Sequence, residues 1–163
     1  MLVFKKDIRK FSEEDIKNVL CQIGTKINDA YINYLLSNKI NRLIFYSIGD
    51  KPDIHNCPCG LIYNVEKSDN CVNIYILFIA TAYKFRKVGY ASLFIKEFIT
   101  FIKEKYNKSG DTNIKIILDS IMEAVTFYEQ IGFKWVITGD YDRKLKITKD
   151  SNVEHFIMIY DVI

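Results

Sequence analysis

Hydrophobic and polar residues alternate near the start of the chain and then change to a helical spacing. The alternation predicts a strand over residues 2–8, and Ser12 with the acids that follow it predicts a capped helix that ends near Gly24. Asp15 stands where a full capping box would have the longer Glu or Gln. A second short helix is expected over residues 27–38.

Strands dominate the next part of the chain. Apolar residues over 42–49 predict a strand, and the turn-rich segment 49–60 closes it. Two further apolar runs, 61–67 and 71–80, are separated by the short polar stretch 68–70. We therefore expect these two strands to form a hairpin.

The spacing becomes helical again after Ala80. An amphipathic helix of about five turns is predicted from Gly89 to about Tyr106. Its apolar face carries Leu93, Phe94, Phe98, Phe101 and Ile102. The later elements are a strand over 113–120, a short helix over 123–133 that stops at Gly132, and closing strands over 133–138 and 155–162.

The order of these elements favours an α+β fold. Hairpins outnumber strand–helix–strand units, and helices are inserted at three points, which fits an open mixed sheet covered by helices. The length of 163 residues suits one domain spanning 1–163, because no linker, repeat or low-complexity tract divides it.

Composition narrows the class of protein. Hydrophobic residues make up 49% of the chain and charged residues 26%, as in a globular protein. A net charge of +3 is too small to indicate nucleic-acid binding, and the most basic run, 141–150, is expected to be a solvated hairpin. The chain shows no long apolar segment typical of a signal peptide or a membrane span, so we expect a cytoplasmic protein without a membrane partner.

Four cysteines are expected to be free thiols in a reducing compartment. His55, Cys57 and Cys59 lie close together, but a structural metal site needs about four ligands and no second Cys/His pair follows them. A turn that leads into a strand explains this segment better than a metal site.

The segment FRKVGYASLF, residues 85–94, raises a question of hydrogen bonding. It runs from the end of a predicted strand into a helix, and no Ser, Thr, Asp or Asn is placed to cap that helix. The first amides of the helix and its positive dipole end favour an anion such as a phosphate, and Gly89 allows close approach of the backbone. Neither a dinucleotide-binding glycine pattern nor a P-loop is present. Water or a neighbouring side chain could also satisfy these amides.

Two segments together resemble the GNAT superfamily of N-acetyltransferases. Residues 86–91, RKVGYA, match the [QR]-x-x-G-x-[GA] pyrophosphate loop of that family, and residues 123–133, EAVTFYEQIGF, match its later A-x-x-F-Y-E-x-x-G-F segment. The resemblance covers about residues 40–138, whereas the amino-terminal region agrees only in its strand–helix–helix order.

This resemblance implies a GNAT-like mixed, mostly antiparallel sheet of about seven strands, splayed between strands 4 and 5, with helices on both faces. It also implies that acetyl-CoA is the acetyl donor, with no metal. The cofactor would be bound by Ile79, Ala80 and Thr81 at the pantetheine arm and, at the pyrophosphate, by Arg86, Lys87, Val88, Gly89, Tyr90, Ala91 and Ser92.

Tyr128 is the residue that the resemblance assigns to catalysis, as the acid that protonates the leaving thiolate. It could instead be a core aromatic residue. The base is unassigned: Tyr75 stands where some relatives have a Glu, and Asp119 and Glu123 could replace it or could simply be surface acids. Ile121 stands near a position at which many relatives have a cofactor-binding Asn.

Three functions follow from these observations. The first is direct acetyl transfer to a primary amine of a small molecule, peptide or protein. The second is a non-catalytic CoA-binding or regulatory module of the same fold, and the third is a small metal-dependent protein built on His55, Cys57 and Cys59. The resemblance also implies that residues 20–40 and 139–154 select the acceptor, but these segments show no pattern that names it. A homodimer through an exposed aromatic patch is possible.

Overall fold

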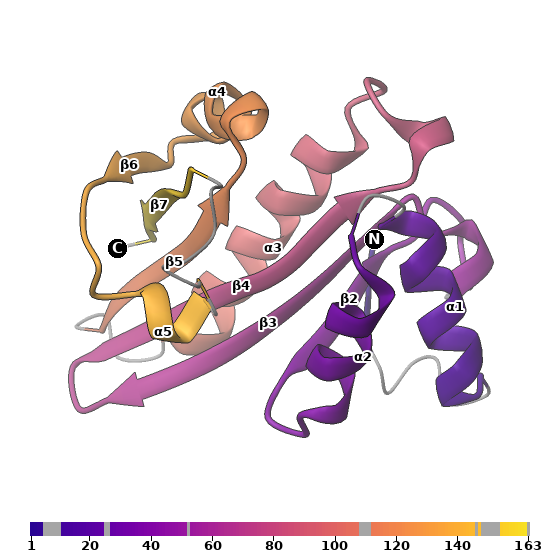
Figure 1. Cartoon of the computed structure of the whole chain (residues 1–163), viewed down its shortest axis with the longest axis horizontal. Coiled ribbons are helices and arrows are strands. Elements are labelled where there is room, and N and C mark those ends of the chain that lie inside the picture. The colour runs from indigo at the N-terminus through magenta and orange to yellow at the C-terminus, as the bar shows by residue number, and fades with distance from the viewer. Residues whose placement is uncertain are drawn as a thin grey trace. The chain divides into compact units, whose positions relative to one another are not determined.

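One seven-stranded sheet organises the chain, in the order β1-β2-β3-β4-β5-β7-β6 (Figure 1). The computed structural model describes residues 1–4, 11–24, 27–51, 53–107, 112–145, 147 and 154–162. β4 and β5 pair in parallel, whereas the pairs β1–β2, β2–β3, β5–β7 and β6–β7 are antiparallel. The predicted α+β class with a mixed, mostly antiparallel sheet is therefore confirmed.

The bounds of the elements agree closely with the sequence pattern. The strands are β1 Leu2–Phe4, β2 Arg42–Tyr46, β3 Cys59–Ser68, β4 Cys71–Thr81, β5 Asn113–Ser120, β6 Lys134–Val136 and β7 Phe156–Asp161. The α-helices are α1 Glu13–Ile23, α2 Asp29–Ser37, α3 Tyr90–Tyr106, α4 Met122–Ile131 and α5 Asp142–Leu145. Two 3-10 turns, η2 Ile54–Asn56 and η3 Tyr83–Phe85, precede β3 and α3.

Contacts along the chain separate two compact units. The first unit comprises Met1–Tyr63 and Phe78–Phe98, and the second comprises Asn64–Leu77 and Ile99–Ile163. The unit boundaries fall inside β3, β4 and α3.

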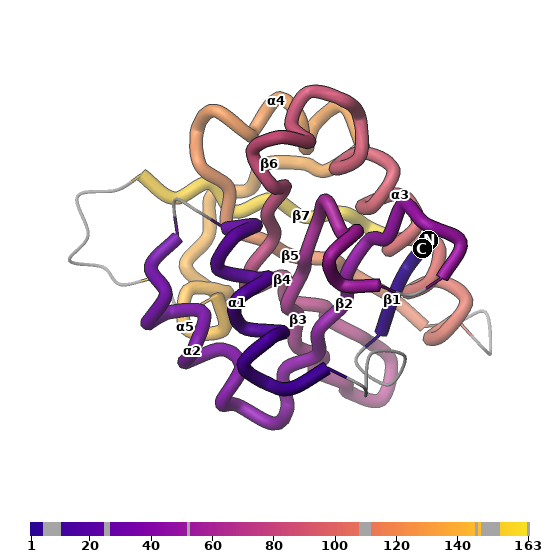
Figure 2. Tube along the Cα trace, turned by 90° about the vertical axis from the view of Figure 1, so that its right-hand side faces the viewer, coloured from indigo at the N-terminus to yellow at the C-terminus, as the bar shows by residue number. Residues whose placement is uncertain are grey.

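In the first unit, α1 and α3 pack on opposite faces of β2 and β3. The ring of Phe98 lies 5.1 Å from that of Tyr63, and the ring of Phe94 lies 5.7 Å from that of Tyr46. On the other face, a Cβ at Gly60 would lie 2.9 Å from Leu20 of α1, so α1 approaches the sheet closely there. α2 lies beside α1 in Figures 1 and 2, and buries Ile32 and Leu35.

The predicted cap of α1 is present. Ser12 accepts a hydrogen bond from the Asp15 amide, and the Asp15 carboxylate accepts one from the Ser12 amide at 3.0 Å. The shorter side chain of Asp15 thus completes a capping box, and the hydrogen bonds from Ser12 lower the pKa of the Asp15 carboxyl group. Gly24 ends the helix as predicted.

In the second unit, α4 and α5 also cover opposite faces of the strands. Tyr128 of α4 contacts Phe133, and Phe133 contacts Tyr160 of β7, with ring centres 5.5 and 5.3 Å apart. On the opposite face, Leu145 of α5 packs in a cluster with Tyr75, Ile117 and Ile157. Gly132 ends α4 in the left-handed conformation, as predicted.

The expected hairpin over residues 141–150 is wrong where the structure describes it. Residues Asp142–Leu145 form α5, because Leu145 buries its side chain against the sheet and Asp142 lies at the helix start, where an acid is favoured. The rest of that prediction, at 146 and 148–150, lies outside the described residues, as do residues 5–8 of the first predicted strand. The strand predicted to reach residue 49 ends at Tyr46.

The pairing of β4 with β5 stops before either strand ends. Their ladder runs from Cys71↔Asn113 to Ile76↔Leu118, while β4 continues to Thr81 and β5 to Ser120. This is the arrangement expected of strands that splay apart after a shared first half.

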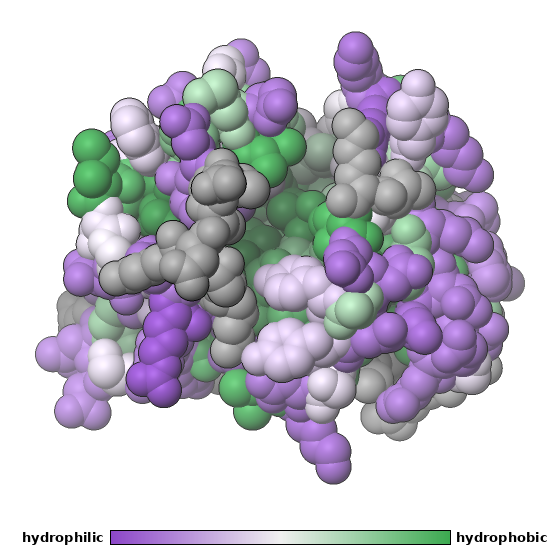
Figure 3. Space-filling view, viewed as in Figure 1, coloured by the Kyte–Doolittle hydropathy of each residue, from purple (hydrophilic) through white to green (hydrophobic). Residues whose placement is uncertain are grey.

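Hydrophilic side chains cover much of the face in Figure 3, and no described helix has the length and apolar character needed to cross a bilayer.

Candidate functional site

The loop from β4 into α3 has an unusual backbone. Lys87 and Gly89 have φ angles of +62° and +95°, so both lie in the left-handed region. A Cβ at Gly89 would meet nothing within 4 Å, and Lys87 is exposed. The loop therefore presents its backbone to open space at the start of α3.

The main-chain amides of this loop lack acceptors. Within the described part of the chain, none of the amides from Lys87 to Ser92 has a hydrogen-bond partner, and Leu93 is the first to bond back, to the Gly89 carbonyl at 3.1 Å. Unpaired N–H groups at a helix start form a binding site for an anion, reinforced by the helix dipole. The first turn of α3 thus has the geometry that the sequence predicted.

Arg86 fixes the shape of the loop from inside. Its Nε donates to the Thr81 carbonyl at 3.1 Å, and its guanidinium lies 5.6 Å from the ring centre of Tyr83. Phe85 packs edge-on against Tyr90, with ring centres 5.8 Å apart. These contacts tie the end of β4 to the start of α3, and Lys87 stays exposed.

Open space borders the start of α3 on a second side. Tyr90 lines a hollow of about 490 Å³ together with Met1, Tyr46, Ser47, Ile48, Gly49 and Asp50. At the end of β4, Ile79, Ala80 and Thr81 are half-buried and lie beyond the ladder with β5. A ligand bound at the amides would therefore have room beside the helix.

Tyr128 is a buried residue of the second unit. Its side chain is 7% exposed, and its ring contacts Phe127 and Phe133. Burial raises the pKa of its phenol, so the hydroxyl stays protonated at neutral pH. No described residue forms a hydrogen bond with that hydroxyl, so none of the described residues accepts its proton.

Tyr75 of β4 stands where some relatives have a Glu. A carboxylate from another strand nevertheless lies beside it. The Tyr75 hydroxyl donates to Glu66 of β3 at 3.0 Å, and Lys144 donates to the other oxygen of Glu66 at 2.6 Å. Burial raises the pKa of Tyr75, whereas the hydrogen bond from Lys144 lowers the pKa of Glu66. Both carboxylate oxygens of Glu66 thus accept hydrogen bonds.

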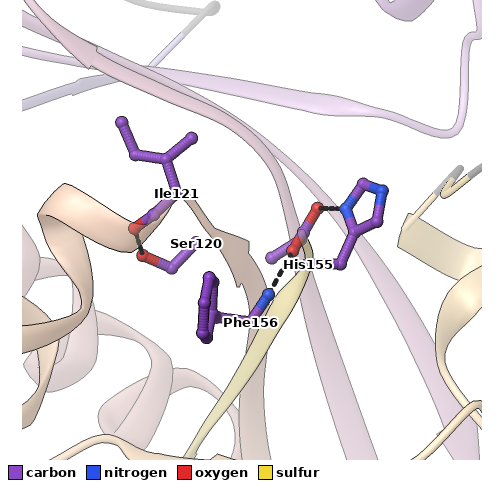
Figure 4. Close-up of polar contacts among 5 residues, drawn as sticks. Ser120, Ile121, His155 and Phe156 are labelled. Atoms are coloured by element: carbon purple, nitrogen blue, oxygen red, sulfur yellow. Dashed lines mark hydrogen bonds and ion pairs between the residues drawn. The ribbon is translucent and has the colours of Figure 1, made fainter. Parts of the chain in front are cut away.

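A second pair, Asp119 with His155, was not predicted. Asp119 Oδ2 lies 2.6 Å from His155 Nδ1, and Asp119 Oδ1 accepts the amide of Phe156 at 3.1 Å (Figure 4). Figure 4 also shows Ser120 donating to the Ile121 carbonyl, a 2.8 Å contact, nearby. The sequence gives no local signal for this pair, because its members are 36 residues apart.

The other candidate residues lie at the surface or in turns. Glu123 is exposed in the first turn of α4, and Ile121, which is 62% exposed, supplies no side-chain cap for that helix. His55 belongs to η2, and Cys57 donates its thiol to the Asp53 carbonyl at 3.1 Å. Within the described residues no group of three or more His, Cys, Asp or Glu could hold a metal ion, and all four cysteines are free.

Comparison with solved structures identifies the fold. The ribosomal-protein-S18-alanine N-acetyltransferase of Escherichia coli is 13% identical over 99% of this chain and 94% of its own, with a TM-score of 0.64. Arabidopsis thaliana Naa50 with the bisubstrate analogue CoA-Ac-MVNAL is 15% identical over 98% of this chain and 97% of its own, with a TM-score of 0.60. An acetyltransferase of the GNAT family from Desulfovibrio desulfuricans is 12% identical over all of both chains, with a TM-score of 0.60.

These similarities show that the chain has the fold of the GNAT N-acetyltransferases, as the resemblance of its two segments implied. Neither protein-family models nor curated protein sequences match the chain. The identities are too low to carry a substrate from one protein to another.

Proposed function

We propose that this protein is an acetyl-CoA-dependent N-acetyltransferase that moves an acetyl group directly to a primary amine of a small molecule, a peptide or a protein. The observation that supports it best is the run of unpartnered main-chain amides from Lys87 to Ser92, at the start of α3 in a chain with the GNAT fold. A diphosphate carries the negative charge and the acceptor oxygens that such a run of N–H groups requires.

Each part of the loop has a role in this proposal. The amides of residues 87–92 would bind the pyrophosphate, Gly89 would let it approach, and Lys87 would add positive charge. Arg86 would act mainly by holding the loop against Thr81. The backbone of Ile79, Ala80 and Thr81 lies beyond the β4–β5 ladder, where its polar groups would pair with the pantetheine arm. An N–H group aimed at the thioester oxygen there would contribute about 3 kcal/mol to catalysis.

Tyr128 would protonate the thiolate that leaves when the amine attacks the thioester. Its raised pKa keeps the phenol in the form that can donate. In this function residues 1–163 would form a single catalytic domain that uses no metal and works in the cytoplasm.

Coenzyme A binding tests the site directly, and Gly89 offers a matched pair of variants. Asn and Asp are the side chains that best tolerate a positive φ, and they differ mainly in charge. Gly89→Asp would place a carboxylate at the proposed pyrophosphate position. We expect its affinity for coenzyme A, measured by calorimetry, to be at least about tenfold lower than that of Gly89→Asn, or about 1.4 kcal/mol. Equal affinities would contradict the assignment of the loop.

Acetyl transfer is tested with a panel of peptides and small amines. Product and free coenzyme A should be separated by chromatography, because the half-buried thiols of Cys21 and Cys71 would react with a thiol reagent. The alternative, a non-catalytic CoA-binding module, is favoured by Tyr75, which occupies the place of a family carboxylate and is held by Glu66. Binding of coenzyme A without transfer to any amine would support that alternative.

A further inference from the structure

We propose that a cavity beside the amino-terminal end of α1 binds a small apolar zwitterion, an α-amino acid with an apolar side chain. The cavity is lined by the start of α1, the second half of α2 and the paired strands β2 and β3, and all of these residues belong to the first unit. Such binding goes beyond acetyl transfer and does not depend on it.

The way in which α1 packs on the sheet places the cavity at the start of this helix. A Cβ at Gly60 of β3 would lie 2.9 Å from Leu20 of α1. A Cβ at Gly24, which ends α1, would lie 2.9 Å from the ring of Phe78. One turn before Leu20, Ile16 lines a cavity of about 330 Å³ instead. This volume is at the lower end of the range of about 300–1,000 Å³ that is usual for ligand pockets, which suits a molecule as small as an amino acid.

Part of the lining is apolar. Four of its side chains are buried and come from three different elements and the sheet between them: Ile16, Leu35, Leu43 and Ile62. Apolar ligand surface that is removed from water here would gain about 25 cal/mol per Å². The ligand therefore needs an apolar body.

Charged side chains of both signs line the same cavity. Among the described residues, the acids of the lining are Glu13 and Glu14, and the bases are Lys17 and Arg42. Their formal charges cancel. A ligand with a single charge would meet as much repulsion as attraction, whereas a zwitterion can place each of its charges beside the opposite sign.

Three polar side chains of the lining have no hydrogen bond with a described residue. Lys17 Nζ lies 3.9 Å from Glu14 Oε1, which is longer than a hydrogen bond, and neither side chain has a closer described partner. The side-chain amide of Asn33 on α2 has no described partner either. A ligand ammonium would therefore donate to Glu14, a ligand carboxylate would accept from Lys17, and Asn33 can pair with either group.

The cavity lies away from the proposed cofactor site. Arg42 begins β2, whereas Tyr46 ends this strand, and the ring of Tyr46 lies 6.4 Å from that of Tyr90 at the start of α3. The length of β2, about 13 Å from first to last Cα, thus separates the cavity from the start of α3. The lining shares no residue with the loop 86–92.

Two other hollows of the first unit are less suited to a zwitterion. The hollow beside Tyr90 borders the amides proposed to bind the pyrophosphate. The other hollow is lined by parts of α1, η2 and η3, including His55 and Lys84, and contains no acid among the described residues of its lining. A ligand ammonium would find no carboxylate there.

Calorimetry of the cofactor-free protein tests the class of ligand. It is done at about pH 6.5, where an α-amino group is charged. L-phenylalanine carries both charges, phenylalaninamide only the ammonium and N-acetylphenylalanine only the carboxylate. We expect a Kd below about 1 mM for L-phenylalanine. The other two compounds should bind at least about tenfold more weakly, because each lacks one charge-assisted hydrogen bond. Glycine, which lacks the apolar body, should bind at least about tenfold more weakly as well.

Two surface variants locate the binding. In Lys17→Gln, L-phenylalanine should bind no better than phenylalaninamide, because the partner of the ligand carboxylate has been removed. In Glu14→Gln, it should bind no better than N-acetylphenylalanine, because the partner of the ligand ammonium has been removed. Lys39→Gln is the matched control, since Lys39 is an exposed lysine outside the lining. It should leave all affinities within about twofold of the wild-type values.

The outcomes separate specific binding from the alternatives. Loss of one preference in each variant supports the proposal. A fall of all affinities by the same factor, which a structural defect would cause, overturns it, as do unchanged preferences in both variants or the absence of binding to the wild-type protein.

Displacement of L-phenylalanine by saturating coenzyme A also overturns it, because the amino acid would then occupy the cofactor site. A wild-type protein that binds L-phenylalanine as expected, but neither binds coenzyme A nor transfers acetyl groups, would overturn the proposed function alone.

Discussion

Tyr128 shows how the surroundings of one residue set its chemistry. Its ring is part of an aromatic cluster with Phe127 and Phe133, whereas its hydroxyl has no hydrogen-bond partner among the described residues. Burial raises the pKa of the phenol, which makes it a weaker acid than a free thiol of pKa about 8.5. In the proposed reaction it would therefore donate its proton only as negative charge develops on the sulfur.

Replacing Tyr128 with Phe tests this role with little change in packing. We expect kcat to fall about 100-fold, because a general acid typically contributes that much, while affinity for coenzyme A stays within about twofold. Tyr160→Phe is the matched control, since it removes a hydroxyl from the same aromatic cluster. An unchanged kcat in Tyr128→Phe, measured with the best acceptor of the panel, would remove Tyr128 from the mechanism.

Sequence reasoning named candidate residues that lie within short segments. Gly89 and Tyr128 stand in two segments that resemble GNAT motifs, so a resemblance over a few neighbouring residues singled them out. The contact of His155 with Asp119 could not be found this way, because Asp119 lies on β5, His155 precedes β7, and only the pairing of β5 with β7 brings them together. The same holds for Glu66, which reaches Tyr75 from β3.

Element boundaries were predictable where a residue type ends or begins a helix for a local reason. Ser12 and Gly24 bound α1, and Gly132 stops α4. α5 was not predictable from its charged residues, since Asp142–Leu145 is a single turn that depends on burial of Leu145 against Tyr75 and Ile117. Tertiary packing decides such short helices.

The end of α4 gives a prediction about stability. Gly132 has φ +113°, and a Cβ there would lie 3.1 Å from the ring of Tyr160. Gly132→Ala should therefore lower the free energy of unfolding by about 1–3 kcal/mol, from backbone strain together with this close contact. Gly49→Ala is the control, because its Cβ would have ordinary contacts, at 3.8 Å or more, and it should change stability little. Urea denaturation of both variants measures the difference, and equal stabilities would contradict the strain at Gly132.

At the scale of the whole molecule, the sequence predicted the kinds and order of the elements better than their partners. Hairpins such as β3 and β4 follow from neighbouring runs, but the parallel pairing of β4 with β5 and the place of β7 between β5 and β6 are set by contacts far apart in the chain. The division into two compact units was also not visible, because its boundaries fall inside regular elements rather than linkers.

Those boundaries lead to a prediction about cooperativity. β3, β4 and α3 each run from one unit into the other, so neither unit can unfold without breaking a strand or helix that continues into its neighbour. We therefore expect one unfolding transition for both units, as for a single domain. Trp135, the only tryptophan, reports on the second unit through its fluorescence. Cys57 and Cys59 report on the first unit through their reaction with a thiol reagent.

The two thiols suit this measurement because burial raises the pKa of Cys57 to about 12 and of Cys59 to about 11. The reactive thiolate is therefore scarce at neutral pH until the first unit unfolds. Both probes should give the same urea midpoint, and Gly132→Ala, which alters only the second unit, should shift both midpoints equally. A shift confined to Trp135 would mean that the units unfold independently, because strain introduced in one would then leave the other untouched.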